Sequence, residues 1–556
     1  MRGFQKIHVK AFHEHYKKII MNLNKRILIY FSFACIAFTS CTKDFDNINT
    51  DPKQSSSSTF NPNLLLPSSE INYVNAITGY NGAILFQSMW TQTFASAKYP
   101  SYYSNADKYV YGGSYNDYIG RTWNLAYSSA GYAYEIQNLV KDKPELSNLS
   151  GVALILELLS IQAVTDVYGD CPFTDALQAK AGLTHPVYNT QQDIYNSMLS
   201  KLDSVLNTLD ASKATPDNDA LPYAGDITKW KKFGYSLMLR MAMRLTKVDP
   251  STAQTYAEKA YAGGTFSSVD DNAYLKMDDA DGYANGNAAA LGVSDDFVEV
   301  KWGKYLIDQL KAADDPRLSV IAEVPQSGLE KASDKGLAGN SDPAVQEGMP
   351  NGYDQNGGAT DISHAPDYPG GTGTGDDYYA VGKYSRVKTA LYLDRSSPAF
   401  ILTYAETELL LAEAAVRGWN VGDASTHYKN GLSAAIQSLG TFNSVGAISA
   451  GTADAYAALH PLDVSTTENS LKQINTQYWI TTGTLFNWIE TWCNWRRSGY
   501  PVLTPVNYTG NFSNGAIPRR QIYPLTEPSN NPENYSTAVG NLSGGDTWTA
   551  KVWWDK

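Results

Sequence analysis

The chain has 556 residues, of which 43% are hydrophobic, 18% charged and 12% aromatic, and its formal net charge at pH 7 is −12. This apolar content excludes a disordered chain, and the acidic balance argues against nucleic-acid binding, which needs a basic surface. Residues 1–40 contain seven Lys and Arg and one Glu, so the remainder carries a net charge of −18. An anionic ligand would therefore need a local cluster of arginines.

The start of the chain has the composition of a bacterial export signal. A short basic stretch precedes an apolar run over residues 27–38, which is shorter than the roughly twenty residues of a membrane-spanning helix. Small residues then lead into Cys41, as in a lipobox. We therefore predict that residues 1–40 are a signal peptide, with Met21 a better start than Met1, and that Cys41 is lipidated. A plain secretory signal with a coincidental cysteine is the alternative.

The residues after Cys41 have the composition of a tether. Thr42–Asp46 combines one lysine with acidic residues, a pattern similar to the signal that sends lipoproteins of Bacteroidetes-type bacteria to the cell surface. The stretch up to residue 62 is rich in Asn, Ser, Thr and Pro. We expect residues 41–62 to be the lipidated cysteine and tether, and residues 63–556 to form a single helical domain, anchored by lipid to the outer membrane and facing the cell exterior.

Helical periodicity dominates the rest of the chain. In Asp226–Lys247 the apolar residues recur at three- and four-residue steps, with Asp226 a plausible N-cap and Pro250 a stop. Pro398–Gly418 follows the same pattern, and the turn Gly418–Asp423 leads into a second helix. Two antiparallel helices with alanines at their contact are similar to a tetratricopeptide (TPR) unit.

The predicted fold is therefore mainly α, with TPR-like helical pairs and long irregular loops. Val152–Val167 is apolar and is expected to be a buried helix. Asn340–Gly375 is rich in Gly, Pro, Asp and Asn, and loops of this length are often functional. Cys171 and Cys493 have apolar neighbours and are expected to be small buried residues. An oxidising location would also permit a disulfide between them.

The sequence has no catalytic or metal-binding motif. Gly370–Gly375 lacks the lysine and the preceding strand of a phosphate-binding loop. His427 is expected on the surface of a helix. The histidines after residue 40 have no metal-ligand spacing; they are His185, His364, His427 and His460.

Three acidic groups could bind calcium or serve a glycosidase. They are Asp270–Asp271, Asp278–Asp281 and Asp376–Asp377. An EF-hand register fails, because Met277 takes the first ligand position when Gly282 is the turn residue. We interpret these groups as solvated loops, and we expect no metal, no cofactor and no enzymatic activity.

Arginine pairs and tryptophans near the end of the chain are interpreted as structural. Arg496–Arg497 falls at a helix end, where cations suit the helix dipole. Arg519–Arg520 is expected to pair with buried carboxylates such as Glu406 or Glu413. Three tryptophans fall on one helical face and are expected to be packing residues: Trp488, Trp492 and Trp495.

Six segments give the chain a distinctive order of motifs. They are VTDVYGDCPFTDAL (164–177), GDITKWKKFGYSLMLRMAMRL (225–245), PAFILTYAETELLLAEAAVRG (398–418), ETWCNWRRSGYPVL (490–503), IPRRQIYPLTEPSNN (517–531) and VWWDK (552–556). Together they resemble the SusD/RagB family of nutrient-binding outer-membrane lipoproteins, most closely its SusD-like branch with a tryptophan-rich ending. Cys171 and Cys493 depart from the pattern, because a plain apolar or small residue is expected there.

The resemblance implies a non-catalytic receptor. Such proteins have a helical body with TPR-like pairs, which docks as a lid on a SusC-like TonB-dependent outer-membrane transporter. Their ligands are usually glycans and in some branches peptides; the ligand is held between lid and transporter and then passed inward. The alternatives are an oligopeptide-binding lid of the same kind, a surface hydrolase, and an adhesin or scaffold without a small ligand.

Aromatic residues with a polar atom suit glycan binding, because tyrosine and tryptophan stack on sugar faces while Asn, Asp and Arg bind hydroxyls. The densest aromatic stretch runs from Tyr99 to Trp123, and the loop that contains Tyr353 is the second choice. Helix-packing tyrosines are the alternative for the first cluster. The candidate ligand-binding residues are Tyr99, Tyr102, Tyr103, Tyr111, Tyr115, Tyr368, Tyr378 and Tyr379.

Overall fold

The computed structural model describes residues 17, 21, 60–98, 101–325, 336–370 and 380–556. Two units divide the chain, Met1–Asn61 and Pro62–Lys556. The predicted lipidation residue, Cys41, lies outside the described residues.

Helices form most of the second unit, as the hydrophobic spacing predicts. The longer helices are α3 (Leu66–Ile77), α6 (Arg121–Val140), α7 (Ser147–Tyr168), α8 (Gln191–Thr208), α9 (Ile227–Arg244), α10 (Pro250–Gly263), α13 (Lys304–Ala312), α16 (Tyr404–Val416), α17 (Ala424–Ser438), α18 (Ala450–Leu459), α19 (Thr467–Thr484), α20 (Trp488–Ser498) and α22 (Pro532–Asn541). The shorter ones are α4 (Gln87–Trp90), α5 (Tyr102–Asp107), α11 (Gly286–Leu291), α12 (Ser294–Glu299), α14 (Leu318–Ile321), α15 (Thr389–Tyr392) and α21 (Glu527–Asn530).

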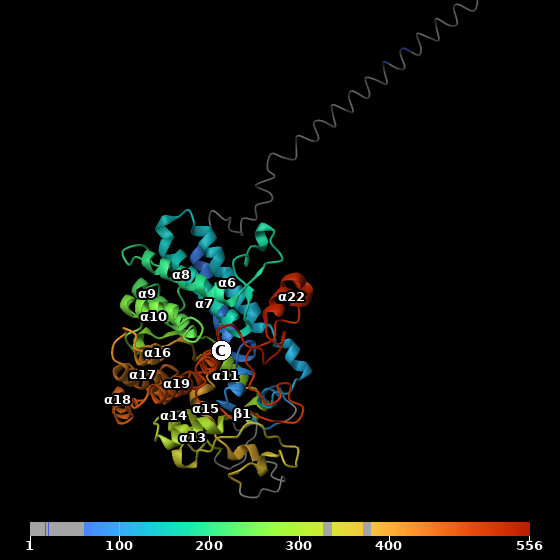
Figure 1. Ribbon diagram of the computed structural model, residues 1–556, viewed down its shortest axis with the longest axis vertical. Helices are drawn as coiled ribbons and strands as arrows, with labels where there is room; N and C mark the ends of the chain where they lie inside the picture. The colour runs from blue at the N-terminus through green and yellow to red at the C-terminus, as the bar shows by residue number, and fades with distance from the viewer. Residues whose placement is uncertain (1–16, 18–20, 22–59, 99–100, 326–335, 371–379) are drawn as a thin grey trace, which may run out of the picture. The chain divides into compact units, whose positions relative to one another are not determined.

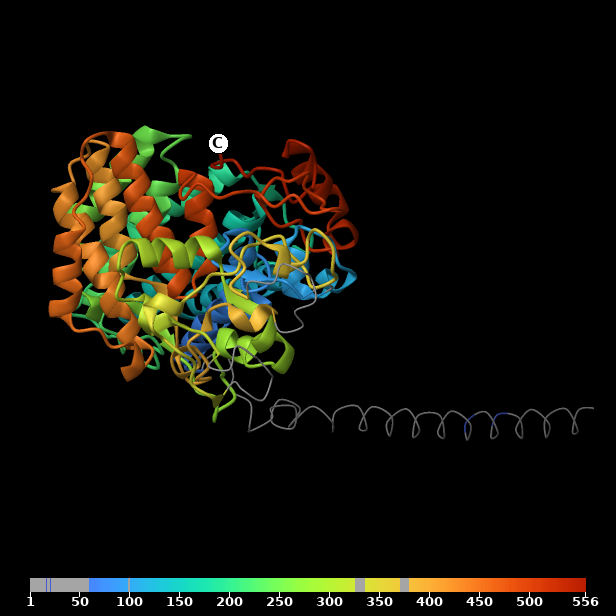
Figure 2. The same ribbon diagram turned by 90° about the horizontal axis from the view of Figure 1, so that it is seen from below.

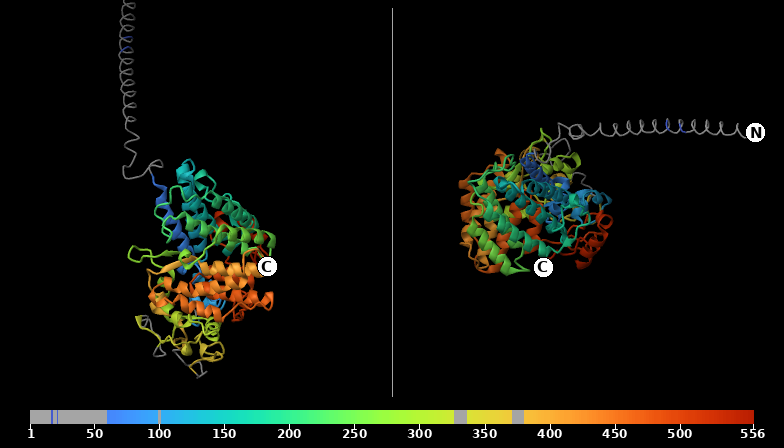
Figure 3. Two further views of the ribbon diagram at one scale, coloured as in Figure 1. Left: turned by 90° about the vertical axis from the view of Figure 1, so that its left-hand side faces the viewer. Right: turned by 90° about the horizontal axis from the view of Figure 1, so that it is seen from above.

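Neighbouring helices in the sequence pack as pairs. The main contacts join α6 with α7, α9 with α10, and α16 with α17, while α19 packs on both α16 and α20. Figure 1 shows the pairs following one another from α6–α8 through α9 and α10 to α16–α18. In Figure 3 the green α9 and α10 lie above the orange α16 and α17. Figures 1 and 2 place α22 on the opposite side of the unit from α16–α18. The predicted helical fold class is confirmed.

Helix α9 shows how sequence signals set the ends of an element. Asp226 caps it by accepting from the backbone N–H groups of Thr228 and Lys229, and its predicted apolar face is buried. The expected stop at Pro250 is wrong by several residues. Helix α9 already ends at Arg244, and Pro250 is the first residue of α10, a position that suits proline because it needs no N–H donor there.

The TPR-like pair begins later than predicted. Pro398–Leu402 is strand β8 instead of the first turns of a helix, and it pairs antiparallel with β4 (Ala273–Lys276). Helix α16 starts after Thr403, whose side chain forms a capping box with Glu406. At the contact with α17, a Cβ on Gly431 would lie 2.9 Å from Leu409 Cγ, so a small residue is needed for the helices to approach.

Short strands connect the helical pairs to the loops. Within the described part of the chain, the remaining antiparallel pairs are β1 (Phe94–Ser96) with β5 (Val300–Trp302), β2 (Cys171–Pro172) with β3 (Tyr188–Asn189), and β6 (Ala322–Glu323) with β7 (Arg386–Val387). In the first pair Phe94 lies opposite Trp302. Strand β1 contacts α5, and Gly303, directly after β5, bridges to Met349 in the loop that follows residue 340.

Among the residues that the structure describes, one helix is apolar enough to cross a membrane by length and composition. It spans Pro144–Tyr168 and is mostly buried inside the protein. Helix α7 is therefore a core helix, as expected. Cys171 and Cys493 are also buried, and both are free thiols.

Several charged side chains are more deeply buried than the sequence suggests. His427 is not a surface residue: it is buried between α16 and α17, and its Nδ1 lies 3.0 Å from Glu408 Oε2.

The three tryptophans of α20 are buried as expected. The predicted partners of Arg519 and Arg520 are wrong, because these arginines pair with Asp555 and Asp546 near the end of the chain.

Glu406 and Glu413 instead face arginines of the helical body. Arg240 Nη2 lies 3.1 Å from Glu406 Oε1. Arg497 reaches Glu413 with both terminal nitrogens, at 2.6 and 2.7 Å. The sequence distance between these partners explains why the pattern alone could not identify them.

Candidate functional site

A pocket of about 670 Å³ opens where the β1–β5 pair meets the long loop, and we call it the loop pocket. Four segments build it: the end of α4, the start of α13, the loop around residue 350, and an extended stretch near residue 505. Its lining residues are Gln92, Lys304, Tyr305, Asp308, Pro350, Asn351, Gly352, Tyr353, Ala359, Thr360, Pro366, Thr504, Pro505, Val506 and Asn507.

A buried ion pair supports the floor of the loop pocket. Asp107 accepts hydrogen bonds from the side chain of Asn351 and from the backbone N–H of Gly352, the latter at 2.7 Å. Lys108 Nζ lies 3.5 Å from Asp107 Oδ2 and donates to Ser104 Oγ at 2.6 Å. Both charged side chains are fully buried. Asp107 is the last residue of α5, and its hydrogen bonds thereby fix the loop against that helix.

Burial shifts both groups of this pair toward their neutral forms. It raises the pKa of Asp107, and the charge of Lys108 opposes this shift. It lowers the pKa of Lys108, and the charge of Asp107 opposes that. The charged form of each group is therefore stabilised by the other group and by the surrounding hydrogen bonds. Through the bonds of Asp107 to Asn351 and Gly352, the pair holds the loop in place.

Further contacts fix the remaining walls. Asp354 accepts from Tyr508 Oη at 2.5 Å and from Thr360 Oγ1 at 2.8 Å. Gln92 has a φ of +55° and donates from Nε2 to the carbonyl of Thr504 at 2.5 Å. This hydrogen bond joins the segment after α4 directly to the extended stretch near residue 505.

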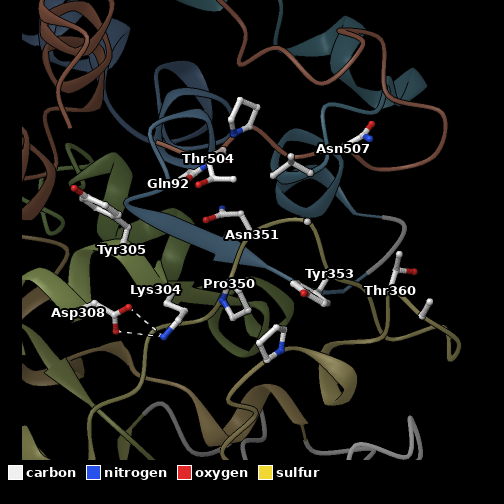
Figure 4. A pocket seen from close by; sticks show the side chains of 15 residues that line it. Gln92, Lys304, Tyr305, Asp308, Pro350, Asn351, Tyr353, Thr360, Thr504 and Asn507 are labelled. Atoms are coloured by element: carbon white, nitrogen blue, oxygen red, sulfur yellow. Dashed lines mark hydrogen bonds and ion pairs between the residues drawn. The ribbon is translucent and has the colours of Figure 1, made fainter. Parts of the chain in front are cut away.

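Two tyrosine rings and several amide and hydroxyl groups face the cavity. Figure 4 shows Tyr305 and Tyr353 on opposite sides, with Asn351 between them. Tyr305 also packs against Trp479, at 5.7 Å between ring centroids, which orients its ring. Lys304 and Asp308 form an ion pair at the edge, 3.1 Å apart and partly exposed. Rings with neutral polar groups suit a polyhydroxylated ligand.

The loop pocket lacks the carboxyl pair of a glycosidase. Among the described residues that line it, Asp308 is the only carboxyl, and it is paired with Lys304. Glycoside hydrolysis needs two carboxyl groups across the scissile bond.

The predicted tyrosines divide into buried and exposed ones. Tyr103 and Tyr115 are buried in the core, and the ring of Tyr115 packs against Phe86. Tyr368 is also buried, against a small cluster that includes Tyr384. Their ring faces are covered by protein, so these three do not offer a stacking surface in this structure.

Tyr102 and Tyr111 are the exposed members, at 38% and 46%. Tyr111 donates to Asn116 Oδ1. The remaining candidates lie outside the described residues: Tyr99, Tyr378 and Tyr379.

Tyr102 belongs to a surface cluster, which we call the Tyr118 patch. Tyr118 lies within the predicted aromatic stretch but is not one of the candidate residues, and Tyr80 lies outside that stretch. The ring of Tyr118 lies 5.4 Å from that of Tyr102 and 5.9 Å from that of Tyr80. The guanidinium of Arg121 lies over Tyr118 at 4.4 Å and donates to Asn81 Oδ1 at 3.1 Å. Rings beside a guanidinium and an amide are also suited to sugars.

Two carboxyls of α12 lie beneath the Tyr118 patch. Asp296 accepts from the hydroxyls of Tyr80 and Tyr103, and Glu299 accepts from Ser96 and Ser101. Burial, with a smaller contribution from the charge of Glu299, raises the pKa of Asp296 to about 8. Hydroxyl donors occupy both carboxyls, which fixes the Tyr80 ring at the edge of the patch.

The residues of the loop pocket could be found from the sequence only in part. Tyr353 lies in a loop that was a candidate because of its Gly, Pro and Asp content. Tyr305, Gln92 and Asn507 stand in stretches without an aromatic cluster. No local signal marks them, because the fold alone brings these segments together.

Comparisons with known proteins agree with this structure. The profile of a SusD-like family, described as starch-binding and associating with the outer membrane, matches residues 55–524. A solved chitin-binding protein is 30% identical, with a TM-score of 0.74, and the match covers 89% of this chain and 100% of that chain. A search of curated proteins found no match.

Two further solved structures share the fold at lower identity. A chitin-binding SusD homologue from Flavobacterium johnsoniae is 22% identical, with a TM-score of 0.70 and coverage of 89% of this chain and 98% of that chain. A SusD-like protein from Bacteroides thetaiotaomicron is 24% identical, with a TM-score of 0.67 and coverage of 89% and 99%. From the profile match and the helical fold together, the chain belongs to the SusD-like family.

Proposed function

We propose that this protein binds a neutral oligosaccharide in the loop pocket and delivers it to a SusC-like TonB-dependent outer-membrane transporter. The observation that carries the proposal is the placement of Tyr305 and Tyr353 on opposite sides of a pocket whose other groups are mostly amides and hydroxyls. Sugar rings stack on such rings while their hydroxyls meet the amides. The family's starch-binding description and a chitin-binding relative support glycan as the ligand class.

The protein is proposed to act as a lipid-anchored receptor without catalysis. Cys41 follows a stretch with the composition of an export signal, and the family is described as associating with the outer membrane. One acyl chain binds a bilayer only weakly, and stable anchoring needs more than one. Labelling with radioactive palmitate tests the anchor: the wild-type protein should incorporate label, and Cys41→Ser should not. Equal labelling of both proteins would contradict lipidation at Cys41.

The binding site is tested by titration of the purified protein with starch-derived and chitin-derived oligosaccharides in a calorimeter. Tyr353→Ala should weaken the binding of the recognised glycan by about tenfold or more, because a stacking ring contributes about 1–3 kcal/mol. Tyr132→Ala is the matched control, since Tyr132 is an exposed tyrosine of α6 outside the pocket. Unchanged affinity in Tyr353→Ala would remove the loop pocket from the mechanism.

The Tyr118 patch provides the competing location. Tyr102→Ala tests it without touching the core, whereas Tyr103→Ala would remove a buried ring. If Tyr102→Ala loses affinity and Tyr353→Ala does not, the glycan binds at the patch. Binding of oligopeptides instead of glycans would support the peptide alternative, and co-purification with a large outer-membrane transporter tests delivery.

A further inference from the structure

A second pocket, of about 540 Å³, lies between α6, the β2–β3 region and α21, and we call it the Glu527 pocket. It shares no lining residue with the loop pocket. The proposed glycan function makes no use of it. Its lining residues are Trp123, Asn124, Tyr127, Ser128, Pro172, Ala176, Leu177, Thr184, Pro186, Glu527, Asn530 and Asn531.

Hydrogen bonds between distant segments hold the Glu527 pocket open. Tyr127 Oη donates to the carbonyl of Pro172 at 2.6 Å. Asn531 Nδ2 donates to the carbonyl of Pro186 at 2.7 Å. The walls therefore come from three parts of the chain that are fixed to one another, which makes the cavity a built feature of the fold.

Aromatic rings form one side of this cavity. The ring of Trp123 lies 5.0 Å from that of Tyr127 and 6.0 Å from that of Tyr188. Asn124 and Ser128 are exposed on the same side of α6, and Asn530 is exposed across from them on α21. The Ser128 hydroxyl donates to the carbonyl of Asn124 at 2.8 Å, so the groups that the pocket offers beside its ring wall are the side-chain amides of Asn124 and Asn530.

Glu527 is a carboxyl without a cationic partner. It accepts a hydrogen bond from the hydroxyl of Tyr188, and the described residues that line the pocket include no lysine, arginine or histidine. Nearby cations have other partners: Arg520 pairs with Asp546, and Lys180 lies 2.9 Å from Glu135. A half-buried carboxylate without a counter-ion is costly to keep charged.

The chemical consequence is a preference for a positive charge in the ligand. Burial raises the pKa of Glu527, and the hydrogen bond from Tyr188 opposes that rise. A cation placed beside the carboxylate would stabilise its charged form. The partly exposed ring of Tyr127 also attracts cations, whereas an anion would be repelled by the carboxylate.

We propose that the Glu527 pocket binds a protonated primary amine on a polar ligand, with Glu527 as its counter-ion. The amide side chains of Asn124 and Asn530 then bind hydroxyl or amide groups that flank the amine. An amino sugar and the lysine side chain or N-terminus of a peptide both carry this chemistry. The pocket is a second binding site, independent of the glycan site proposed above.

Calorimetric titrations of the full-length protein with three probes test this proposal. The probes are a tetramer of glucosamine, the same tetramer fully N-acetylated, and a short lysine-containing peptide with blocked ends. At least one amine probe should bind, and Glu527→Gln should weaken its binding by about tenfold to hundredfold, as expected for a charged hydrogen bond. The glutamine still accepts the hydrogen bond of Tyr188, so the pocket keeps its shape.

Two further variants separate the pocket from general effects of charge. Glu533→Gln removes the same charge from an exposed position on α22 and should leave amine binding unchanged. Ser128→Tyr fills the pocket from an exposed helical position and should abolish binding. Tyr353→Ala, in the loop pocket, should have no effect on the amine probes.

The outcomes distinguish the two sources of the amine. Binding of the glucosamine tetramer alone supports an amino sugar, and binding of the lysine peptide alone supports a peptide. The proposal is overturned if neither amine probe binds. It is also overturned if, in the Tyr353→Ala variant that removes the proposed glycan site, the N-acetylated tetramer binds as tightly as the free amine. Wild-type binding by both Ser128→Tyr and Glu527→Gln would overturn it as well.

Discussion

The centre of the helical body and the loop pocket both hold charged residues, but they use them differently. In the helical body Arg497 meets Glu413 through two hydrogen bonds, and both side chains are almost fully buried. At the loop pocket Lys304 Nζ contacts both carboxylate oxygens of Asp308, at 3.1 and 3.5 Å, and solvent reaches the pair. Buried charges with complete partners fix the packing of helices, whereas partly exposed groups keep the capacity to bind something else.

The pKa of Glu413 shows how strongly the buried arginines of the helical body act. Burial alone would raise the pKa of Glu413, but the charges of Arg497 and Arg417 hold it well below its usual range. Stability from this group is therefore present above the ordinary carboxyl pKa and is lost as the pH falls toward the depressed value. The helical body should lose stability in strong acid.

The largest expected effect comes from breaking the buried pair. Arg497→Met leaves Glu413 with Arg417 as its remaining ionic partner, and should lower the free energy of unfolding by about 3–5 kcal/mol. Denaturant titration measures this change. The double variant with Glu413→Leu should recover part of the loss. A single variant as stable as the wild type would show that the pair is not structural.

Lys180→Met provides the exposed control for that experiment. Lys180 pairs with Glu135 on the surface and its side chain is 83% exposed. Its removal should change the free energy of unfolding by less than about 1 kcal/mol. Similar losses in Arg497→Met and Lys180→Met would contradict the contrast between buried and exposed charge.

A change in the pocket wall should have an intermediate effect. Gly352 has a φ of +89°, and a Cβ there would lie 2.8 Å from Val506 Cγ1. Gly352→Ala should lower stability by about 1–3 kcal/mol and weaken glycan binding, because the Asn351 side chain is displaced with the loop. Gly357→Ala is the matched control, since Gly357 also has a positive φ but open space around it. Equal glycan affinity in both variants would contradict the role of the Val506 contact.

A smaller, pH-dependent effect is expected at the edge of the helical body. Burial lowers the pKa of His427, but the hydrogen bond and the charge of Glu408 outweigh it, and the pKa is raised overall. The stabilisation is therefore complete below about pH 6.5 and is lost as the pH rises through the raised value. His427→Gln should reduce the melting temperature at pH 5.5 and much less at pH 9. A loss independent of pH would indicate packing alone.

The smallest effect is expected at the pocket edge. Lys304→Ala removes a partly exposed ion pair with Asp308 and should change the free energy of unfolding by less than about 1 kcal/mol. Thermal denaturation of the variant at low and high salt measures it. A loss above about 2 kcal/mol would mean that the pair supports the fold in the way that Arg497 does.

Local signals explain which parts of the fold could be predicted. The spacing of apolar residues locates α7, α9 and the α16–α17 pair. The start of α16 was misplaced because the apolar run Pro398–Leu402 continues the helical spacing into a strand. The Thr403 and Glu406 capping box was present in the sequence and marks the true start.

Contacts between distant segments explain what could not be predicted. Arg519 pairs with Asp555 and Arg520 with Asp546, and no pattern near these arginines selects those partners over Glu406. Tyr103 and Tyr115 stand in the aromatic stretch that favoured binding, yet packing buries them. Burial of a tyrosine depends on what the fold places against it, which composition does not determine.

The wall segments of the loop pocket are separated by hundreds of residues. Gln92 is hydrogen-bonded to the carbonyl of Thr504, so the cavity closes only when residues near both ends of the body have met. A chain truncated before residue 504 would lack one wall altogether. If the loop pocket is the glycan site, only the fully folded chain can bind the glycan. Glycan binding would then measure correct folding of the body as well as the state of the pocket.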